Sequence, residues 1–334
     1  MVTNVALSSA TATEPALLAL DWGSTGLRAF LLDARGHQRA SRSASLGASA
    51  MNGQADSYVA ALTQVAGDWL QTWPTLPVVA CGMVGAKHGW REAPYVPCPA
   101  DAHALAAQAI ALQLDGGQTL HIIPGLRHQA PACTPDVMRG EETQLVGAMQ
   151  LHPQLADAAC VIMPGTHSKW AQLGAGQVRD FHTQMTGELF ALLRQHSVLG
   201  RLMPPTRVDT PSAADEAGFL AGVAAAQAQG EQGLPRQLFA VRTLGLMEQL
   251  PLDSLEDYLS GLLIGHELRA GLAWRDAGGC THAPLALIGE PALCQRYRLA
   301  LEQFKVTAPL LLGNTAPEGL WSLALTAGWA AAPA

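Results

Sequence analysis

Short apolar runs alternate along this chain with turns rich in glycine, serine and threonine. Residues 16–20 are a continuous apolar run, residues 21–26 form a turn, and residues 27–33 are a second apolar run that ends at a turn over 34–36. Apolar runs of this length between turn residues are typical of strands. The pattern therefore predicts a hairpin with residues 21–26 at its tip, followed by a further strand over 38–46.

Other stretches carry apolar residues at helical spacing. In one of them, residues 57–72, the apolar positions lie on one helix face: Val59, Leu62, Val65 and Leu70. A helix is expected there, with a strand after it at 77–81. The same reasoning predicts later helices over 216–227, 254–273, 292–304 and 318–330, and strands over 284–288 and 306–312. Strands that alternate with helices in this way predict an α/β fold.

The order of elements at the start of the chain occurs a second time. A strand over 160–163 leads to a tip over 164–169, then to two strands and a helix over 187–196. Because 142 positions separate Gly23 in the first tip from Gly165 in the second, the repeat has the size of a domain rather than of a solenoid unit. We therefore expect a duplicated α/β domain.

Composition fits two folded domains and excludes several partners. The 334 residues are 49% hydrophobic and 14% charged, which is sufficient for two cores. The formal net charge is −7 and the only lysines are Lys87, Lys169 and Lys305, so no basic stripe can neutralise a nucleic-acid backbone. No window approaches ~18 uninterrupted apolar residues, and residues 1–15 lack the basic and apolar segments of a secretory signal. We expect neither nucleic acid nor a membrane as a partner.

The cysteines indicate a reducing compartment. They lie far apart, without a CxxC pair or a partnering histidine spacing: Cys81, Cys98, Cys133, Cys160, Cys280 and Cys294. This spacing argues against a zinc site and against a disulfide scaffold. We expect reduced, mostly buried thiols in a cytoplasmic protein.

The first tip has the composition of a phosphate-binding loop. Gly23, Ser24 and Thr25 supply backbone N–H groups, unobstructed by a Cβ at the glycine, together with hydroxyl donors. The carboxylate of Asp21, at the end of the preceding strand, would be repelled by phosphates unless it holds Mg²⁺ between them, so Asp21 is the candidate metal ligand. An ordinary Asp–Gly hairpin is the alternative interpretation.

The second tip has a similar set of donors. Gly165, Thr166, His167, Ser168 and Lys169 include one of the three lysines and no acid. Two donor-rich tips, one in each domain, can close on a polyphosphate from both sides. The chain has no GxxxxGK[ST] phosphate loop and no GxSxG nucleophile elbow.

These motifs resemble a known superfamily. The Asp21–Thr25 segment, the glycine–threonine tip of the second half and a late strand–glycine–helix turn are similar to those of sugar kinases, actin and the heat-shock ATPases. More narrowly, five segments resemble the 2-dehydro-3-deoxygalactonokinase family: 81–85, 89–99, 136–144, 164–170 and 185–190. The similarity extends from about Leu17 to Trp329.

The resemblance implies a fold and an activity. The fold would be two duplicated ribonuclease-H-like (actin-like ATPase) domains with a cleft between them. We expect a disordered tail over 1–15, an N-terminal phosphate- and substrate-binding domain over 16–150 and a C-terminal nucleotide-binding domain over 151–334. The implied activity is phosphorylation of the terminal (C6) hydroxyl of 2-dehydro-3-deoxy-D-galactonate, with ATP and Mg²⁺. A homodimer is one assembly compatible with this sequence.

The same resemblance carries over to individual residues. Asp21–Thr25 would contact Mg²⁺ and the phosphates, residues 165–169 the other side of the phosphates, and Gly289 the adenosine. Two positions depart from the superfamily pattern. Pro164 stands where many members have an acid, and Gly289 is followed by Glu290 where a pair of glycines is usual.

An acid near the second tip is the candidate catalytic base. Glycerol- and xylulose-kinase-like relatives carry Gly–Asp at the start of a helix, and Gly140–Glu141 is similar. We rank Glu141 first, Glu142 second and Asp136 third as the group that accepts the proton of the attacking hydroxyl. The alternative is that both glutamates only complement the dipole of the helix.

The acceptor would be an anionic keto acid, whose carboxylate needs a guanidinium or backbone amides. The candidate contacts are Arg28, Arg139 and the amides of Met83, Val84 and Gly85, with Trp90 and Tyr95 as walls of the sugar site. Three other functions remain open at this stage: an ATPase or polyphosphate hydrolase on the same fold, a kinase of a related gluconate-type keto-deoxy acid, and a non-catalytic sugar-acid sensor. The walled acceptor loop over 82–99 favours a kinase over a hydrolase, which needs only water.

Overall fold

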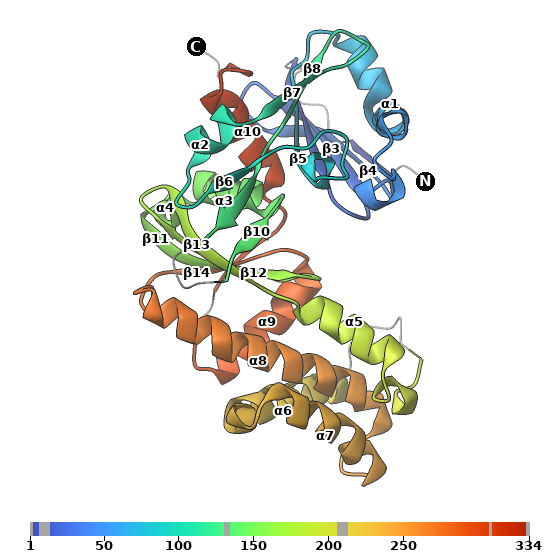
Figure 1. The fold of residues 1–334 in the computed structure, drawn as a ribbon, viewed down its shortest axis with the longest axis vertical. Coiled ribbons are helices and arrows are strands. Elements are labelled where there is room, and N and C mark those ends of the chain that lie inside the picture. Colours follow the sequence, from blue (N-terminus) through green and yellow to red (C-terminus); the bar gives the residue numbers. More distant parts are fainter. Residues whose placement is uncertain (1–2, 7–13, 130–133, 206–212, 307–308, 332–334) are drawn as a thin grey trace. The chain divides into compact units, whose positions relative to one another are not determined.

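The computed structural model describes residues 3–6, 14–129, 134–205, 213–306 and 309–331. The chain divides into two compact units (Figure 1). The first consists of residues 1–158, 173–182 and 314–334, and the second of residues 159–172 and 183–313. The C-terminal segment 314–334 thus belongs with the N-terminal elements, whereas the sequence-based division placed it in the second domain.

A seven-stranded sheet is the centre of the first unit, in the order β1-β4-β3-β2-β5-β8-β7. Its strands are β1 (Thr3–Ala6), β2 (Pro15–Trp22), β3 (Leu27–Asp33), β4 (Gln38–Ala44), β5 (Val78–Gly82), β7 (Ile110–Gln113) and β8 (Thr119–Ile122). Strands β2, β3 and β4 pair antiparallel in succession, and β5 and β8 continue the sheet in parallel with β2. The expected hairpin is confirmed, and β1 forms within the segment expected to be a tail.

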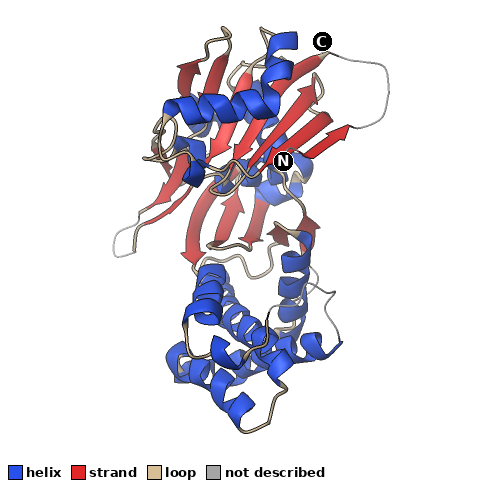
Figure 2. Ribbon diagram, turned by 90° about the vertical axis from the view of Figure 1, so that its right-hand side faces the viewer, coloured by secondary structure: helices blue, strands red, loops and turns tan. Residues whose placement is uncertain are grey.

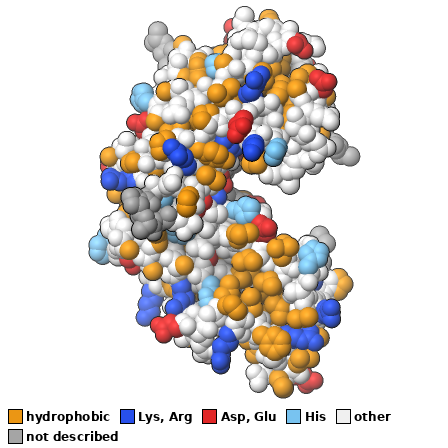
Figure 3. Space-filling view, viewed as in Figure 1, with side chains coloured by type: hydrophobic (Ala, Val, Ile, Leu, Met, Phe, Trp, Pro, Cys, Tyr) orange, Lys and Arg blue, Asp and Glu red, His pale blue; other side chains and the backbone are white. Residues whose placement is uncertain are grey.

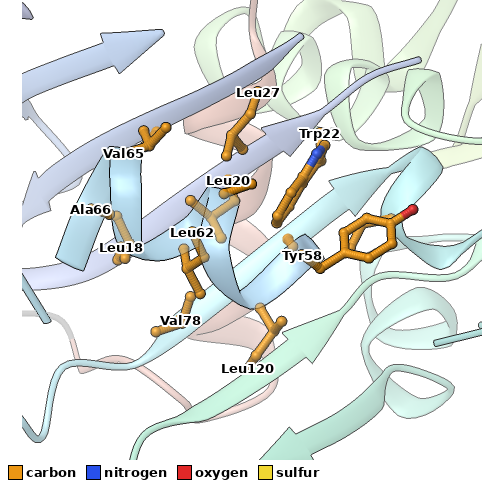
Figure 4. Close-up of a cluster of buried hydrophobic side chains, with 14 of the residues drawn as sticks. Leu18, Leu20, Trp22, Leu27, Tyr58, Leu62, Val65, Ala66, Val78 and Leu120 are labelled. Carbon is orange, nitrogen blue, oxygen red and sulfur yellow. The ribbon is translucent and has the colours of Figure 1, made fainter. Parts of the chain in front are cut away.

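Helix α1 (Ala55–Thr72) covers one face of this sheet. Leu18, Leu20 and Trp22 of β2 point into a cluster with Tyr58 and Leu62 of α1 (Figure 4). Each of these side chains is buried, which stabilises the unit by roughly 1.5–3 kcal/mol per large apolar side chain. The residues of β2 alternate between the two faces of the sheet, so Asp21 points to the face opposite α1.

The opposite face is contacted by α10 (Ala316–Thr326), the last helix of the chain. It also packs on α3 (Glu141–Leu151). Gly147 and Gly319 permit this approach, because a Cβ at either position would lie 1.9 Å from a carbonyl oxygen of the partner segment. Because a sheet covered on both faces needs apolar residues at successive positions, β2 is a continuous apolar run.

Smaller elements complete the first unit. A three-stranded sheet has the order β10-β9-β6. The remaining bounds are β6 (Tyr95–Pro97), β9 (Gly125–His128), β10 (Asp136–Met138), α2 (Ala102–Ala107) and α4 (Gln154–Asp157).

The second major sheet has the order β13-β12-β11-β14-β15. Its strands are β11 (Ala158–Met163), β12 (Ser168–Gly174), β13 (Gln177–Gln184), β14 (Leu285–Ile288) and β15 (Leu310–Leu312). In this sheet the first strand in the chain, β11, is central, with the second and third (β12, β13) on one side and the fourth and fifth (β14, β15) on the other. The strands β4-β3-β2-β5-β8 of the first sheet are arranged in the same way around β2. The same topology therefore occurs twice, as the repeated sequence pattern predicts.

Helices α5 to α9 make up most of the second unit (Figures 1 and 2). They are α5 (Thr186–His196), α6 (Ala213–Gln229), α7 (Leu234–Leu246), α8 (Leu255–Ala277) and α9 (Pro291–Gln303). Gly261 and Gly265 of α8 lie against α6, where a Cβ on Gly261 would be 2.0 Å from the carbonyl oxygen of Phe219. These small residues leave room for the neighbouring helix, whereas α7 has no counterpart among the predicted helices.

Two further expectations concern cysteines and membranes. Five cysteines are free thiols in the described residues, and Cys133 lies outside them. Cys81, Cys160 and Cys294 are buried. Within the described ranges, no helix has the length and apolar character needed to cross a bilayer.

Candidate functional site

Asp21 is the penultimate residue of β2 rather than part of a turn. Its register partners are Arg28 on β3 and Cys81 on β5. The Arg28 Nη2 atom lies 2.6 Å from Asp21 Oδ2, and the Asn314 Nδ2 group donates to the same oxygen at 3.4 Å. Burial raises the pKa of Asp21 above its ordinary value, while Arg28 and Asn314 counteract that shift.

The first tip is a tight turn whose backbone is hydrogen-bonded to the segment around Ala48. The Gly23 N–H donates to the carbonyl oxygen of Gly26 at 2.9 Å, and the side chains of Ser24 and Thr25 are exposed. A 3₁₀ turn over Ala48–Ala50 donates its first N–H to Gly23 O at 2.9 Å. The tip therefore presents its hydroxyl groups to solvent on a fixed backbone.

A cavity lies beside this tip. Its volume is about 490 Å³. Its lining combines the tip with strand β4: Gly23, Thr25, Gly26, Leu27, Arg28, Ser43, Ala44 and Ser45. The backbone amides, hydroxyl groups and guanidinium of these residues make it a site suited to an anion.

Two glycines bring the start of α3 to the end of β5. Gly82 has φ of 91° and Gly140 has φ of 107°, both in the region that favours glycine. A Cβ on Gly140 would lie 3.2 Å from the Cα of Gly82. The charges of Asp21 and Glu142 both raise the pKa of the buried Cys81 thiol, after the larger effect of burial itself, so both carboxyl groups lie near the end of β5.

The two glutamates of α3 differ in environment. Glu142 is fully buried and accepts the Gly140 N–H at 2.7 Å and the Thr143 hydroxyl at 3.0 Å. Glu141 is half-buried and accepts the Arg139 N–H at 3.0 Å. Burial, with a smaller contribution from the neighbouring Glu141, raises the pKa of Glu142 to about 8. Both carboxyl groups cap backbone amides at the helix start, and Glu141 is the more accessible of the two.

The predicted acceptor loop packs on Arg139. The Arg139 Nη2 group donates to Ala93 O at 2.7 Å, and its guanidinium carbon lies 4.3 Å from the ring centroid of Tyr95. The Nε and Nη1 atoms of Arg139 are buried without a hydrogen-bond partner. A Cβ on Gly85 would lie 3.0 Å from Nη1. Arg139 thus connects the short turn over Met83–Gly85 to the segment that carries Tyr95.

Trp90 connects the same loop to α1 and to β2. Its ring stacks on Tyr58, with centroids 5.6 Å apart, and meets Trp22 edge-on at 6.0 Å. Trp22 is adjacent to Asp21 in the chain and directly precedes Gly23. The end of β5 in the first unit therefore has Asp21, Arg28 and both glutamates nearby, with Arg139 linking residues 83–85 to Tyr95. Trp90, predicted as a wall of the sugar site, packs instead against Tyr58 of α1, on the face of the sheet opposite Asp21.

The second tip, in the other unit, is arranged differently along its length. Thr166 and His167 are exposed, while Ser168 and Lys169 are the first residues of β12 and are buried. The Lys169 Nζ group donates to Thr183 Oγ1 at 2.8 Å. His167 Nε2 lies 2.5 Å from Glu188 Oε2 on α5. Two of the five residues predicted to contact phosphate at this tip, Ser168 and Lys169, are therefore buried.

A cavity of about 360 Å³ lies next to the second tip, within the range of small-molecule sites. Its lining includes residues of the tip and of α5, α8 and α9: Gly165, Thr186, Phe190, Glu256, Asp257, Leu293, Arg296 and Tyr297. Gly289, the predicted adenosine residue, has φ of 155° and lies against Pro164, whose carbonyl oxygen would be 3.4 Å from a Cβ. Gly289 is therefore a neighbour of both the second tip and the helix that lines the cavity.

Sequence reasoning missed several residues of these sites. Cys81, Asn314 and Thr143 surround Asp21 and Glu142 in the first unit. Thr186 and Glu267 lie beneath the second tip. Cys81 had a local signal, since it ends a strand parallel to β2, but Asn314 lies 293 positions from Asp21 and has none.

Comparison with known proteins gives the following similarities. A sequence profile of the family described as 2-keto-3-deoxy-galactonokinase matches residues 21–323. The 2-dehydro-3-deoxygalactonokinase of Escherichia coli (strain K12) is 38% identical over 306 residues, covering 90% of this chain and 94% of the relative. A crystal structure from Sinorhizobium meliloti, described as a 2-dehydro-3-deoxygalactonokinase protein, has a TM-score of 0.80 and 32% identity, covering 92% of this chain and 98% of that one. The activator of the 2-hydroxyisocaproyl-CoA dehydratase from Clostridium difficile, solved with bound ADPNP, shares the fold alone: its TM-score is 0.50 at 12% identity, covering 94% of this chain and 96% of that one.

Proposed function

We propose, from the premise that this chain belongs to the 2-keto-3-deoxy-galactonokinase family, that it transfers the γ-phosphate of ATP to the terminal (C6) hydroxyl of 2-dehydro-3-deoxy-D-galactonate. Family membership confirms the resemblance inferred from the five sequence segments. The repeated strand order and the structural similarities confirm the α/β fold with two ribonuclease-H-like domains.

The main structural support for this function is that two acids lie near the end of β5. Asp21 at the end of β2 and Glu142 near the start of α3 both act on Cys81 at the end of β5. The phosphate-type tip over residues 23–26 begins two residues after Asp21, and Glu141 precedes Glu142. The presence of acids beside a turn rich in backbone amides and hydroxyl groups supports a phosphotransferase.

The nucleotide has a candidate place in the second unit. The exposed Thr166 and His167 would contact phosphates, and the cavity of about 360 Å³ would hold adenosine. Phe190 and Leu293 offer apolar surface to a purine ring, while Glu256 and Asp257 can accept hydrogen bonds from ribose hydroxyls. Gly289 would serve this site by leaving room beside Pro164. The buried Ser168 and Lys169 would then support the tip from behind.

The first unit can offer Mg²⁺ one protein carboxylate, that of Asp21. Asp21 supplies one carboxylate, its Oδ2 atom is already paired with Arg28, and no group of three or more acids, histidines or cysteines among the described residues forms a metal cage. Magnesium in kinases is usually held by one or two carboxylates together with substrate phosphates and water, and this single acid is compatible with that arrangement. When bound, the ion would neutralise charge on the phosphates. Asp21 would hold it directly or through water.

The chain's own residues would do the rest of the chemistry. Glu141, the more accessible acid, would accept the proton of the C6 hydroxyl or orient that group, and Glu142 would fix the helix start that carries it. Backbone amides of the first tip would stabilise charge on the transferred phosphoryl group. A positioned acceptor loop over 83–95 would keep the sugar hydroxyl, rather than water, in line with the phosphate.

The acceptor's carboxylate would bind near Arg28, whose side chain is half exposed. Arg139 has a different role in this proposal. Because its guanidinium donates to Ala93 and stacks on Tyr95, it would hold the loop that presents Tyr95 and the amides of Met83, Val84 and Gly85 to the sugar acid.

A coupled assay of ADP release tests this function. The wild-type protein should release ADP at a rate well above its water-driven rate with 2-dehydro-3-deoxy-D-galactonate, and more slowly with the gluconate-derived epimer. Mass spectrometry of the product should show one added phosphate at C6. A rate that does not respond to the acid would favour an ATPase, and a preference for the epimer would change the assigned substrate.

Two finer proposals concern assembly and compartment. Hydrophobic side chains gather over the helices of the second unit (Figure 3), and Phe239, Leu246 and Met247 are 57%, 54% and 69% exposed. We assign this surface to a homodimer contact, to be tested by light scattering of the wild type and of Phe239→Glu, which should be monomeric. The five free thiols favour a reducing, cytoplasmic location.

A further inference from the structure

A buried carboxylate on α8 accepts hydrogen bonds from three segments of the second unit, β12, α5 and α9. Glu267 is 2% exposed. Its Oε1 atom accepts the Trp170 indole N–H at 2.9 Å, and its Oε2 atom accepts the Tyr297 hydroxyl at 2.7 Å and the Thr186 hydroxyl. Ser168 joins this group through Tyr297, whose hydroxyl lies 3.0 Å from Ser168 Oγ.

These donors surround the second tip. Ser168 directly follows the exposed tip residues, Trp170 continues the same strand, Thr186 is the first residue of α5, and Tyr297 lies on the helix after Gly289. Thr186 and Tyr297 also line the cavity proposed for adenosine. One carboxylate therefore connects every segment that would contact the nucleotide in this unit.

A hydrogen-bond relay extends from this carboxylate to the tip backbone. The Tyr297 hydroxyl donates to Glu267 and lies 3.0 Å from Ser168 Oγ, so the Ser168 hydroxyl can donate to Tyr297. Ser168 Oγ in turn accepts the Gly165 N–H at 3.4 Å. Each group in this relay donates to the next one, from Gly165 through Ser168 and Tyr297 to Glu267. The last group, Glu267, must therefore be an acceptor.

The start of α5 is locked to the same tip. The Glu188 N–H donates to the Thr166 carbonyl oxygen at 3.0 Å, and a Cβ on Gly187 would lie 2.4 Å from the Gly165 carbonyl oxygen. Thr186, one residue earlier, is bound to Glu267. The hydroxyl of Thr186 and the relay through Tyr297 thus hold the two sides of the tip to one anchor.

The stability of the folded protein does not by itself explain why a carboxylate occupies position 267. Burial raises the pKa of Glu267 above its ordinary value, because a charge is costly in such surroundings. In the part of the chain that the structure describes, Glu267 has no ion-pair partner, and only hydrogen bonds counteract that cost. An apolar side chain at this position would avoid the cost but leave Thr186, Tyr297 and Trp170 without their acceptor.

We propose that Glu267 is a positioning residue of the kinase reaction, which acts through Thr186 and the Tyr297–Ser168 relay to hold the second tip in its phosphate-binding geometry. The proposal rests on the assignment of this tip to the phosphates of ATP. It predicts that Glu267 affects binding of the phosphate portion of the nucleotide and leaves binding of the adenosine portion largely unchanged.

Glu267→Gln tests the proposal, because it keeps the shape but places an N–H₂ donor among the donors. The affinities of adenosine, ADP and a non-hydrolysable ATP analogue should be measured by calorimetry, along with kcat and the KM of ATP and of the sugar acid. We expect about a tenfold or greater loss of ADP and ATP-analogue affinity, the usual effect of one unpaired buried hydrogen-bonding group. Adenosine affinity and the KM of the sugar acid should change by less than about threefold. Glu302→Gln, an exposed acid on α9, is the matched control and should behave as the wild type.

Thr186→Val and Tyr297→Phe provide a second measurement if Glu267→Gln does not fold. Each removes one hydroxyl donor and keeps the bulk, so each should weaken ADP about threefold or more relative to adenosine. Equal losses of adenosine and ADP affinity, or unchanged ADP affinity in all folded variants, would overturn the proposal. A wild-type protein that binds ADP but does not phosphorylate the sugar acid would instead contradict the proposed substrate and leave this comparison intact.

Discussion

The guanidinium of Arg28 and the carboxylate of Asp21 form an ion pair across the β2–β3 hairpin, with Nη2 2.6 Å from Oδ2. The two residues are direct register partners, so the pairing is fixed by the strands rather than by flexible side chains. Asp21 is almost fully buried, whereas half of the Arg28 side chain is exposed. Arg28 therefore serves Asp21 from the solvent side, next to the cavity beside the first tip.

Replacement of Arg28 by alanine should move the acidic limit of activity upward in pH. Burial raises the pKa of Asp21 and Arg28 lowers it, so removal of the guanidinium leaves the raising effect less opposed. Asp21 would then remain protonated to higher pH, and the acidic limb of the pH profile of kcat/KM should shift in that direction. Arg28→Lys should restore part of the shift, since it restores the charge without the geometry of the guanidinium.

Arg35→Ala is the control for this experiment. Arg35 is an exposed arginine at the turn after β3, outside the proposed site. Its removal should leave the pH profile unchanged. If Arg28→Ala leaves the acidic limb at its wild-type position, Asp21 is not the group that limits activity at low pH.

The assignment of the base is tested by neutral amides at the two positions of α3. Glu141→Gln should reduce kcat by about 100-fold or more while ATP binding is retained, which is the usual contribution of a positioned base. Glu142→Gln should reduce kcat less, by about tenfold at most, because the amide oxygen can still accept the Gly140 N–H. A larger loss at Glu142 than at Glu141 would transfer the role of base to Glu142. Asp136→Asn is the third variant, and it should have the mildest effect, because Asp136 lies on β10 and accepts the N–H of Val137.

Sequence reasoning succeeded where the signal is local. The β2–β3 hairpin, the helix over 57–72 and the repeated strand order follow from runs of apolar residues and from turn residues within a few positions of each other. The close approach of α6 at Gly261 and Gly265 also had a local signal, because small residues on a buried helix face leave room for a neighbour.

Sequence reasoning failed where the position of a residue depends on contacts with residues far away in the chain. Asn314 reaches Asp21 from 293 positions away, and α10 joins the first unit because glycines on two distant helices permit contact. Ser168 and Lys169 have the composition of an exposed donor tip, but β12 begins at Ser168 and is buried along its whole length. Glu267 is one of several acids on a long helix, and only its three side-chain donors, Trp170, Thr186 and Tyr297, distinguish it.

Gly82→Ala should destabilise the first unit more than a matched glycine elsewhere. Gly82 has φ of 91°, and a Cβ there would lie 2.6 Å from the carbonyl oxygen of Trp22. Gly117 has nearly the same φ, 90°, but no atom within 4 Å of its Cβ position. Gly117→Ala should therefore cost only the conformational strain, about 1–2 kcal/mol. Gly82→Ala should cost roughly 3 kcal/mol or more and also reduce activity, since it displaces the strand end beside Asp21.

Urea unfolding of the two alanine variants provides the measurement. The midpoint of Gly82→Ala should lie clearly below that of Gly117→Ala, at the same slope. Equal midpoints would mean that β5 can shift away from Trp22 at little cost, and the close contact between these strands would then not be a constraint on the site.

Glu142 should make the stability of the protein fall as pH rises through neutrality. Burial, aided by the charge of Glu141, raises the pKa of Glu142 from 4.5 to about 8. Between these two values the folded state binds a proton that the unfolded state has lost, so unfolding becomes easier with each step up in pH. The stabilising contribution is complete below pH 4.5 and is lost as the pH passes about 8. Over that window it amounts to a few kcal/mol, on the order of 1.4 kcal/mol per pH unit.

Glu142→Gln isolates this contribution, because its amide resembles the protonated acid at every pH. Urea midpoints of the wild type and the variant should be similar near pH 5 and diverge toward pH 8, with the variant more stable at the higher value. Glu141→Gln is the informative companion, since it removes the neighbouring charge that helps to raise the pKa of Glu142. In the Glu141→Gln variant, the decrease in the urea midpoint between pH 5 and pH 8 should be smaller than in the wild type. A difference between Glu142→Gln and the wild type that stays constant from pH 5 to pH 8 would show that Glu142 is ionised in the folded protein throughout, and that its amide donors stabilise the carboxylate more than burial opposes it.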